Sequence, residues 1–416
     1  MRKVLIICDL FPPAFAPRMG YLCKYLPEYG WEPVVITEYI PQNIYKELAD
    51  SCPNVTSINY YQSDNTFSRH LKYAFVFFAD FFFGYKDRVM TKIAQRQIEK
   101  HDISLILSSA YRTFPLRTAY KLSKKNHIPL LVDLRDIIEQ FPSNEHISKK
   151  ITRSKTINRI IANLLTKKLF RQRNKVLQNA EAVTTVSPWH VDVLKQYAKN
   201  VDLIYNGFDP ELFVPKAVPA KTFKITYTGR LMSAELRDPS LLFETVANLY
   251  AAGKIAPESF RIQFYTDDES EKTLNAIAGK YHVADFMDYF GYVSNHAIPG
   301  ILNESSVLLL LTNKSDAGKS PKGIMTTKVF EYLAVEKPVL CVRNDEGCLA
   351  ETIRETQSGI AANTVEQVER FMMDKYAEWQ QNGYTHQQTD RQKVRQFSRK
   401  EQAKQFVRIF DSLIEK

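Results

Sequence analysis

The chain has 416 residues, of which 44% are hydrophobic and 25% charged, and its formal net charge is +10. This length is more than one hydrophobic core usually accommodates, so we predict two or three globular domains. The composition is that of a soluble globular protein, which excludes a disordered or fibrous chain. No apolar run reaches the length of a membrane span, the first residues lack a signal-peptide pattern, and the five cysteines lack the CxxC spacing of a zinc site. We therefore expect a cytoplasmic protein with reduced thiols and no bound metal.

Positive charge is concentrated in the first half of the chain. Residues 1–200 hold 30 Lys and Arg against 17 Asp and Glu, whereas residues 201–416 hold 26 against 29. A basic half indicates an anionic partner, although a generally soluble surface would also account for it. No helix-turn-helix, zinc-finger or RNA-binding signature is present, so we expect no nucleic acid partner.

An aromatic run and a basic run in this half are candidates for such a contact. Residues 71–85 include eight aromatic side chains and are flanked by basic residues, and residues 165–175 are rich in Lys and Arg. Aromatic rings interleaved with cations suit the headgroup region of a bilayer. We expect either attachment to the inner face of an anionic membrane or an ordinary buried aromatic helix.

Strand-like and helix-like segments alternate from the first residues onward. A buried run at 3–8, an amphipathic stretch at 18–29 and a second buried run at 33–37 form a βαβ unit. This half therefore predicts a doubly wound α/β domain, which binds ligands at the carboxyl ends of its strands. Further strand-like runs follow at 105–109, 130–133 and 182–186.

The same alternation restarts after residue 200. Strand-like runs lie at 224–228, 261–265, 287–290, 306–311 and 338–342. We predict two Rossmann-like domains facing each other across a cleft, at residues 1–200 and 201–394, and a C-terminal helix at about 395–416 that packs on the first domain.

The second domain contains a loop and a helix start that suit a phosphorylated, hydroxyl-rich ligand. A loop with Gly323 leads into a helix that begins near Thr326 or Thr327, and free N–H groups at a helix start attract anions. Lys328 and Glu331 share one face of the first turn, where a carboxylate can accept hydrogen bonds from sugar hydroxyls.

Two arginines follow the first strand of the same domain. Gly229 permits close approach of the backbone to a ligand, and Arg230 and Arg237 lie where a diphosphate would meet bidentate guanidinium groups. A solvated loop with two surface arginines is the alternative.

Charged residues also follow a strand of the first domain. Asp133, Arg135 and Asp136 could orient an acceptor hydroxyl or position a reacting group, or Arg135 could form a structural ion pair with one of these aspartates. In the second domain the acidic run at 266–269 lacks converging ligands from other elements, so we expect a solvated loop there.

These segments, in this order, resemble glycosyltransferase family 4, whose members have the GT-B fold. The resemblance extends over nearly the whole chain and rests on the order and spacing of short motifs. The motifs lie at residues 11–13, 18–19, 30–37, 131–136, 180–187, 203–209, 228–230, 290–293 and 328–334.

The resemblance implies an enzyme that moves a sugar from a UDP- or GDP-linked donor to an acceptor, with retention of anomeric configuration. It implies that the nucleotide sugar is a substrate and that no separate cofactor or metal is bound. Glu331 matches the glutamate that holds the donor ribose, and Arg230 matches the basic residue that faces the diphosphate. The other matches are Val293, near the base, and Gly323, Ile324 and Met325, whose backbone faces the donor sugar.

The chain departs from the family pattern at three places. Gly323 stands where the first of two glutamates eight residues apart is expected, and the usual lysine after Arg230 is absent from its place. Arg237 or Lys328 can supply that cation, and we assign catalytic roles to Arg230, Lys328 and, in the first domain, Asp136. The third departure is a Pro-containing loop instead of a Gly-rich loop after the first strand. These changes occur together in a polysaccharide-type subgroup, which the chain resembles.

We expect a metal-independent hexosyltransferase of surface polysaccharide or lipopolysaccharide biosynthesis with a lipid-linked saccharide acceptor. One alternative is a nucleotide-sugar epimerase of the same fold, which would need a carboxylate and a His for proton abstraction. The other is a non-catalytic, membrane-docked assembly protein with a degenerate donor site, which the missing glutamate at Gly323 motivates.

Overall fold

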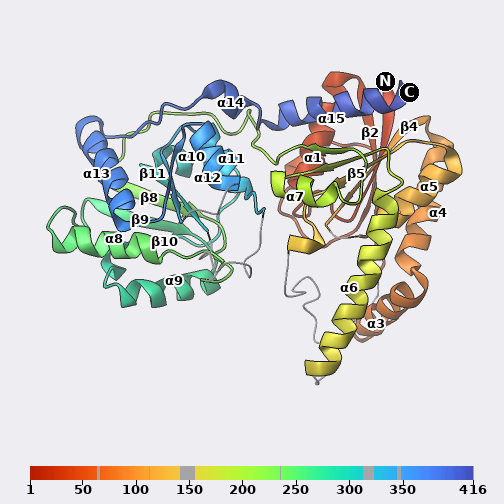
Figure 1. Cartoon of the computed structure of the whole chain (residues 1–416), viewed down its shortest axis with the longest axis horizontal. Coiled ribbons are helices and arrows are strands. Elements are labelled where there is room, and N and C mark those ends of the chain that lie inside the picture. Colours follow the sequence, from red (N-terminus) through yellow and green to blue (C-terminus); the bar gives the residue numbers. More distant parts are fainter. Residues whose placement is uncertain are drawn as a thin grey trace. The chain divides into compact units, whose positions relative to one another are not determined.

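The computed structural model describes residues 1–62, 66–111, 113–140, 155–234, 236–312, 323–343 and 348–415, apart from the side chains of residues 66–70, 155 and 157. The chain forms two compact units, Met1–Tyr205 with Arg399–Lys416, and Asn206–Ser398 (Figure 1). Each unit is built on one parallel β-sheet.

The first unit contains a sheet of seven described strands in the order β3-β2-β1-β4-β5-β6-β7. Buried aliphatic residues make up most of the central strands, as expected for parallel strands that helices cover on both faces. The bounds are β1 Arg2–Cys8, β2 Trp31–Glu38, β3 Val55–Ile58, β4 Ile103–Ala110, β5 Leu130–Leu134, β6 Ala182–Thr185 and β7 Val201–Leu203.

Helices cover both faces of this sheet (Figure 1). Leu5 and Ile7 of β1 pack with the core layer of α4, α5 and the end of α6, whereas Val4 and Ile6 pack with the layer of α1 and α15. This alternation is the two-residue period of a strand. The bounds are α1 Pro17–Tyr25, α2 Lys46–Ala49, α3 Thr66–Phe83, α4 Tyr85–Lys100, α5 Leu116–Asn126, α6 Lys155–Leu177, α7 Pro188–Leu194 and α15 Arg399–Ile414, with 3-10 turns at Leu26–Tyr29 and Ile138–Gln140.

The second unit contains a sheet of six described strands in the order β10-β9-β8-β11-β12-β13. The strands are β8 Phe223–Thr228, β9 Phe260–Tyr265, β10 Met287–Tyr289, β11 Val307–Leu311, β12 Val339–Val342 and β13 Gly359–Ala362. The helices are α8 Ser240–Ala251, α9 Asp268–Lys280, α10 Ile298–Glu304, α11 Thr327–Ala334, α12 Cys348–Glu355, α13 Val365–Asn382 and α14 Arg391–Arg395, with a 3-10 turn at Ala284–Phe286.

Both sheets place the first strand of their unit between the second and the fourth. The strand order therefore reverses next to β1 and next to β8, and in open α/β sheets ligands bind outside the carboxyl ends of the strands at such a reversal. In the second unit, the segment after β8 and the segment that leads into α11 meet at this point. The candidate ligand site therefore lies in residues 229–237 and 323–331.

The predicted α/β architecture of two Rossmann-like domains is confirmed. The edge strands β3 and β13 were not predicted, because they are short and half exposed and so lack a continuous apolar run. The helix expected over residues 18–29 ends as an α-helix at Tyr25 and continues as a 3-10 turn, where Pro27 cannot donate a backbone hydrogen bond.

The structure also describes the apolar segments of the chain. Among the described residues, no helix is long and apolar enough to cross a bilayer. The alternative of a buried aromatic helix at residues 71–85 is wrong, because Val76 is the one residue of that segment that is fully buried.

Candidate functional site

Tyr227, at the end of β8, organises the predicted cations of the second unit. Its hydroxyl accepts hydrogen bonds from Arg237 (3.2 Å, Nη1) and Lys328 (3.3 Å, Nζ) and donates one to the carbonyl of Arg230 (2.8 Å). The Lys328 ammonium also lies 4.7 Å from the centre of the Tyr227 ring. The structure therefore brings the segment of Arg230 and Arg237 together with the first turn of α11.

Gly229 makes this approach sterically possible. A Cβ added at Gly229 would lie 2.7 Å from Cε and 2.9 Å from Nζ of Lys328, and the backbone φ of +105° suits glycine. The structure thus shows a close approach of Gly229 to the Lys328 side chain of the same domain, and its approach to a ligand stays a prediction.

Burial tunes the charge of Lys328. Desolvation, together with the nearby Arg237 cation, lowers the pKa of Lys328 to about 7, and the Glu331 carboxylate opposes this shift. An anion bound at this place would favour the charged ammonium. The pair Lys328 and Glu331 shares the first helical turn, as predicted.

Arg230 extends from this cluster into solvent. Its side chain is 64% exposed, its Nε lies 3.1 Å from Oδ2 of Asp267, and its guanidinium lies 5.9 Å from the centre of the Tyr292 ring. An exposed guanidinium held at its base by an ion pair remains accessible to a phosphate.

The segment after β8 is tied to the neighbouring strands of the sheet. Asp238 accepts a hydrogen bond from Arg343 (2.8 Å, Nε), which follows β12, and its backbone N–H donates to the carbonyl of Thr312 (2.9 Å). These contacts stabilise the loop that carries Arg230 and Arg237, and sequence reasoning did not identify them.

The remaining predicted donor-site residues lie in the same unit. Gly323 (φ +67°), the exposed Ile324 and the buried Met325 lead directly into α11. Val293 is half-buried beside Tyr292, which is 69% exposed. Their proposed contacts with base and sugar stay predictions.

A solvated loop was expected for the acidic run at 266–269, and this expectation is wrong. Asp267 caps the start of α9 by accepting a hydrogen bond from the Ser270 N–H (2.9 Å), and the following acidic residues belong to the first helical turn. Negative side chains stabilise a helix start, so these residues have a structural role. Among the described residues, no group of three or more His, Cys, Asp or Glu is arranged to hold a metal ion.

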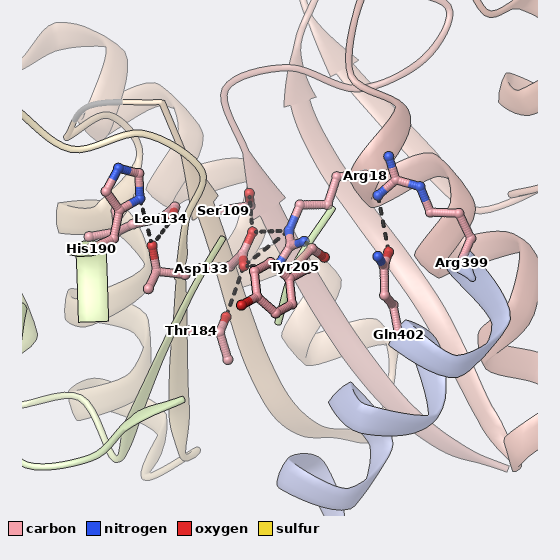
Figure 2. Close-up of polar contacts among 10 residues, drawn as sticks. Arg18, Ser109, Asp133, Leu134, Thr184, His190, Tyr205, Arg399 and Gln402 are labelled. Atoms are coloured by element: carbon pink, nitrogen blue, oxygen red, sulfur yellow. Dashed lines mark hydrogen bonds and ion pairs between the residues drawn. The ribbon is translucent and has the colours of Figure 1, made fainter. Parts of the chain in front are cut away.

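In the first unit, Asp133 is a buried structural residue rather than an acceptor-binding one. Arg18 donates to both carboxylate oxygens of Asp133 at 2.8–3.2 Å, and Ser109 and Thr184 donate at 3.1 and 2.8 Å (Figure 2). Burial opposes ionisation of Asp133, but the Arg18 cation holds its pKa below the usual value. Arg18 also donates to the carbonyl of Tyr205 (2.8 Å), which follows β7.

Arg135 does form an ion pair, but with neither of the aspartates that had been considered. Its partner is Asp9, after β1, at 2.7 Å. Asp136 is half-buried next to this pair, and burial raises its pKa although Arg135 opposes the shift. Of the three residues with predicted catalytic roles, Asp136 belongs to the first unit, whereas Arg230 and Lys328 belong to the second.

His190, on α7 of the first unit, is buried. Its Nδ1 lies 3.1 Å from Oγ1 of Thr185, its exposure is 1%, and burial lowers its pKa to about 4 (Figure 2). A neutral, enclosed imidazole does not suit proton abstraction from a substrate, so His190 does not support the epimerase alternative.

Comparison with known proteins identifies the family. Residues 18–212 match the model of glycosyltransferase family 4. These residues form a domain of glycosyltransferase family 4. The chain is thus a glycosyl-transferring enzyme, and the family predicted from the motifs is confirmed. No curated protein matches the chain in sequence.

Solved structures of GT-B proteins share the fold of this chain. Sucrose-phosphate synthase from Thermosynechococcus elongatus is 14% identical with a TM-score of 0.61, and all of both chains is covered. HepE from Anabaena in complex with UDP is 14% identical with a TM-score of 0.64, covering 99% of this chain and 100% of that one. The lipopolysaccharide outer core galactosyltransferase WaaB is 13% identical with a TM-score of 0.56, covering 99% and 100%.

Proposed function

We propose that this glycosyltransferase transfers a hexose from a nucleotide-sugar donor to a lipid-linked saccharide, with retention of anomeric configuration, in the assembly of a surface polysaccharide or lipopolysaccharide. The second unit would bind the donor and the first unit would present the acceptor. The main support is the pair of cations Arg237 and Lys328, which share the Tyr227 hydroxyl at the strand-order reversal of the second unit. Arg230 lies next to them, because the same hydroxyl donates to its backbone carbonyl, and its exposed guanidinium adds a third cation.

These cations suit the departure of a nucleoside diphosphate. When the bond between the sugar and the diphosphate breaks, negative charge grows on the leaving phosphate, and fixed cations stabilise that charge in the transition state. The first turn of α11 adds backbone N–H groups to the same place. A cation set of this kind can neutralise a diphosphate with side chains of the chain itself, and no protein nucleophile is required.

Glu331 is the proposed ribose ligand. It is half-buried on the first turn of α11, three residues after Lys328, and its carboxylate influences the charge of that lysine. A carboxylate can accept hydrogen bonds from two neighbouring ribose hydroxyls. Gly323, Ile324 and Met325 would approach the donor sugar, and Val293 the base.

A uridine nucleotide is the first donor to test. HepE, which shares the fold, has been solved with UDP, with UDP and glucose, and with UDP-glucose. A guanosine nucleotide remains in the test panel, because the base contacts near Val293 depend on loop details that differ between such proteins.

The acceptor proposal rests on the first unit. Its sequence is strongly basic, it carries exposed aromatic side chains on α3, and Asp136 offers a half-buried carboxylate after β5. We assign Asp136 to the orientation of an acceptor hydroxyl. The fold is shared by WaaB, a lipopolysaccharide galactosyltransferase, which motivates saccharides carried on lipids as the acceptor class.

The test uses two substitutions in the proposed donor site and two matched controls. Arg230→Ala should reduce sugar transfer by about 100-fold, the range found when one transition-state contact is removed. Glu331→Ala should reduce it by about 10- to 100-fold, because hydrogen bonds to a charged group contribute about 1.5–3 kcal/mol to binding. Arg354 and Glu351 form an exposed ion pair on α12 of the same unit, and Arg354→Ala and Glu351→Ala should retain activity.

Transfer is measured by chromatography of a radiolabelled donor with membrane-extracted saccharide lipids, after circular dichroism has shown that each variant is folded. Full activity in both site variants would contradict the assignment. Incubation without acceptor should leave the nucleotide sugar unisomerised, since conversion to an epimer would favour the alternative enzyme.

A further inference from the structure

The helix α3 carries an apolar stripe on its outer side. Leu71, Phe75, Phe78 and Phe82 follow one another at intervals of three or four residues, which places them on one face of the helix. Their exposed fractions lie between 57 and 66%. Val76 lies on a different face and is buried in the core of the first unit, so the stripe points away from the sheet.

The helix α6 lies beside α3 (Figure 1) and adds positive charge. Lys168 donates to the backbone carbonyl of Phe81, and its ammonium lies 4.7 Å from the centre of that ring. Ile160, Leu164, Lys167 and Arg171, which we call the α6 face, are spaced by three or four residues and are all exposed. The α6 face therefore changes along the helix from apolar to basic.

We propose that the apolar stripe of α3 and the α6 face together form a docking surface for an anionic lipid bilayer. Phenylalanine rings would enter the boundary between headgroups and acyl chains, and the cations of α6 would meet lipid phosphates. Long Lys and Arg side chains can keep their charge at the headgroups while their stems cover apolar surface.

Charge distinguishes a bilayer from a second copy of the chain as the occupant. In a two-fold interface the same patch is present on both copies, so Lys167 and Arg171 of each copy would be gathered in one interface. The patch contains no acidic residue to pair with them, and like charges repel. A bilayer that contains anionic lipids presents the opposite charge to the same patch. This inference extends the proposed acceptor class, because docking would hold the first unit next to lipid-linked saccharides.

The experiment measures binding of the full chain to sedimented vesicles without donor or acceptor, so its result is independent of sugar transfer. Vesicles are made of phosphatidylcholine with or without phosphatidylglycerol. We expect binding to the phosphatidylglycerol vesicles that weakens with added salt, because the screening length falls from about 10 Å at about 0.1 M salt to about 3 Å at about 1 M.

Neutralising the two cations of the α6 face tests the electrostatic part of the proposal, and a pair of cations on α15 serves as the matched control. Lys167→Gln with Arg171→Gln should lower vesicle binding about 25-fold, since each cation near an anionic surface contributes about fivefold. Lys404 and Arg408 are also an exposed lysine and arginine four residues apart, on α15, which packs in the opposite core layer. Lys404→Gln with Arg408→Gln should change binding less than about threefold.

The apolar part is tested by Phe75→Ser with Phe78→Ser. Both side chains are more than half exposed, so the melting temperature should be preserved while vesicle binding falls. Absence of binding to phosphatidylglycerol vesicles by the native chain would overturn the proposal. An equal loss in the α15 control would do the same, as would a dimer that the Phe variants dissociate without a change in vesicle binding.

Discussion

Tyr227 and Gly229 decide how the cations of the second unit are arranged, although neither carries a charge. The tyrosine hydroxyl joins Lys328 and Arg237, and the missing Cβ of the glycine leaves room for the lysine stem. A buried tyrosine needs a partner for its hydroxyl, so its position two residues before Gly229 was a usable signal. The sequence analysis predicted roles for Gly229, Arg230 and Arg237, but not for Tyr227.

The lowered pKa of Lys328 predicts pH-dependent donor binding. Its pKa is about 7 in the free protein, and a bound diphosphate would raise that value, so binding takes up a proton above about pH 7. Affinity should therefore fall as pH rises through this range, by at most about tenfold per pH unit. Titration calorimetry with UDP from about pH 6 to about pH 9 measures this fall.

Lys328→Arg is the control for that prediction. The arginine stays charged throughout this range, so the variant should show a flatter dependence, and the titration of UDP itself is common to both proteins. Identical slopes for the two proteins would show that Lys328 does not contact the diphosphate.

At the scale of elements, the packing of α11 against the end of β8 determines the site. Lys328 and Glu331 lie on one face of α11, and this face can contribute to the proposed donor site because the helix start lies beside the loop after β8. The order of strands in the sheet places these two segments together. Hydrophobic periodicity predicted both elements. The contact between them joins residues 101 positions apart, which local patterns do not specify.

Gly229→Ala should separate this contact from general backbone strain. The added Cβ would displace Lys328, and the left-handed backbone costs about 1–3 kcal/mol for a residue other than glycine. Gly253 also has a positive φ (+68°), but no atom lies within 4 Å of its added Cβ. Urea unfolding should show a similar loss of stability for Gly229→Ala and Gly253→Ala, whereas UDP affinity should fall in Gly229→Ala alone. A loss of affinity in both variants would argue against the role of this contact.

At the scale of the whole molecule, the end of the chain stabilises its beginning. The helix α15 belongs to the first unit, and Phe410 packs edge-to-face on Trp31 with ring centres 5.1 Å apart. The buried pair Arg18 and Asp133 joins α1 to β5 in the same unit, and Arg18 reaches the carbonyl of Tyr205 at the boundary of the two units. Segments far apart in sequence thus complete one core.

Phe410→Ala should test that contribution of α15. Removing a fully buried phenylalanine costs about 3–5 kcal/mol in free energy of unfolding, which we expect in denaturation followed by tryptophan fluorescence. Phe83→Ala, at a ring that is 67% exposed in the same unit, should cost less than about 0.5 kcal/mol. If both variants lose the same stability, the last helix does not complete this core.

The amino-acid sequence by itself determined the alternation of strands and helices, the two-domain α/β architecture and the helix that carries Lys328 and Glu331, because these depend on periodicity and capping within short segments. Only the tertiary structure decided which charges pair and which aromatic residues are exposed. Arg135 pairs with Asp9, 126 positions away, and not with Asp133 or Asp136. Phe75, Phe78 and Phe82 of α3 are exposed, although the aromatic composition of this segment equally suits a core. Both outcomes depend on which distant segments meet in space, and a local pattern contains no information about that encounter.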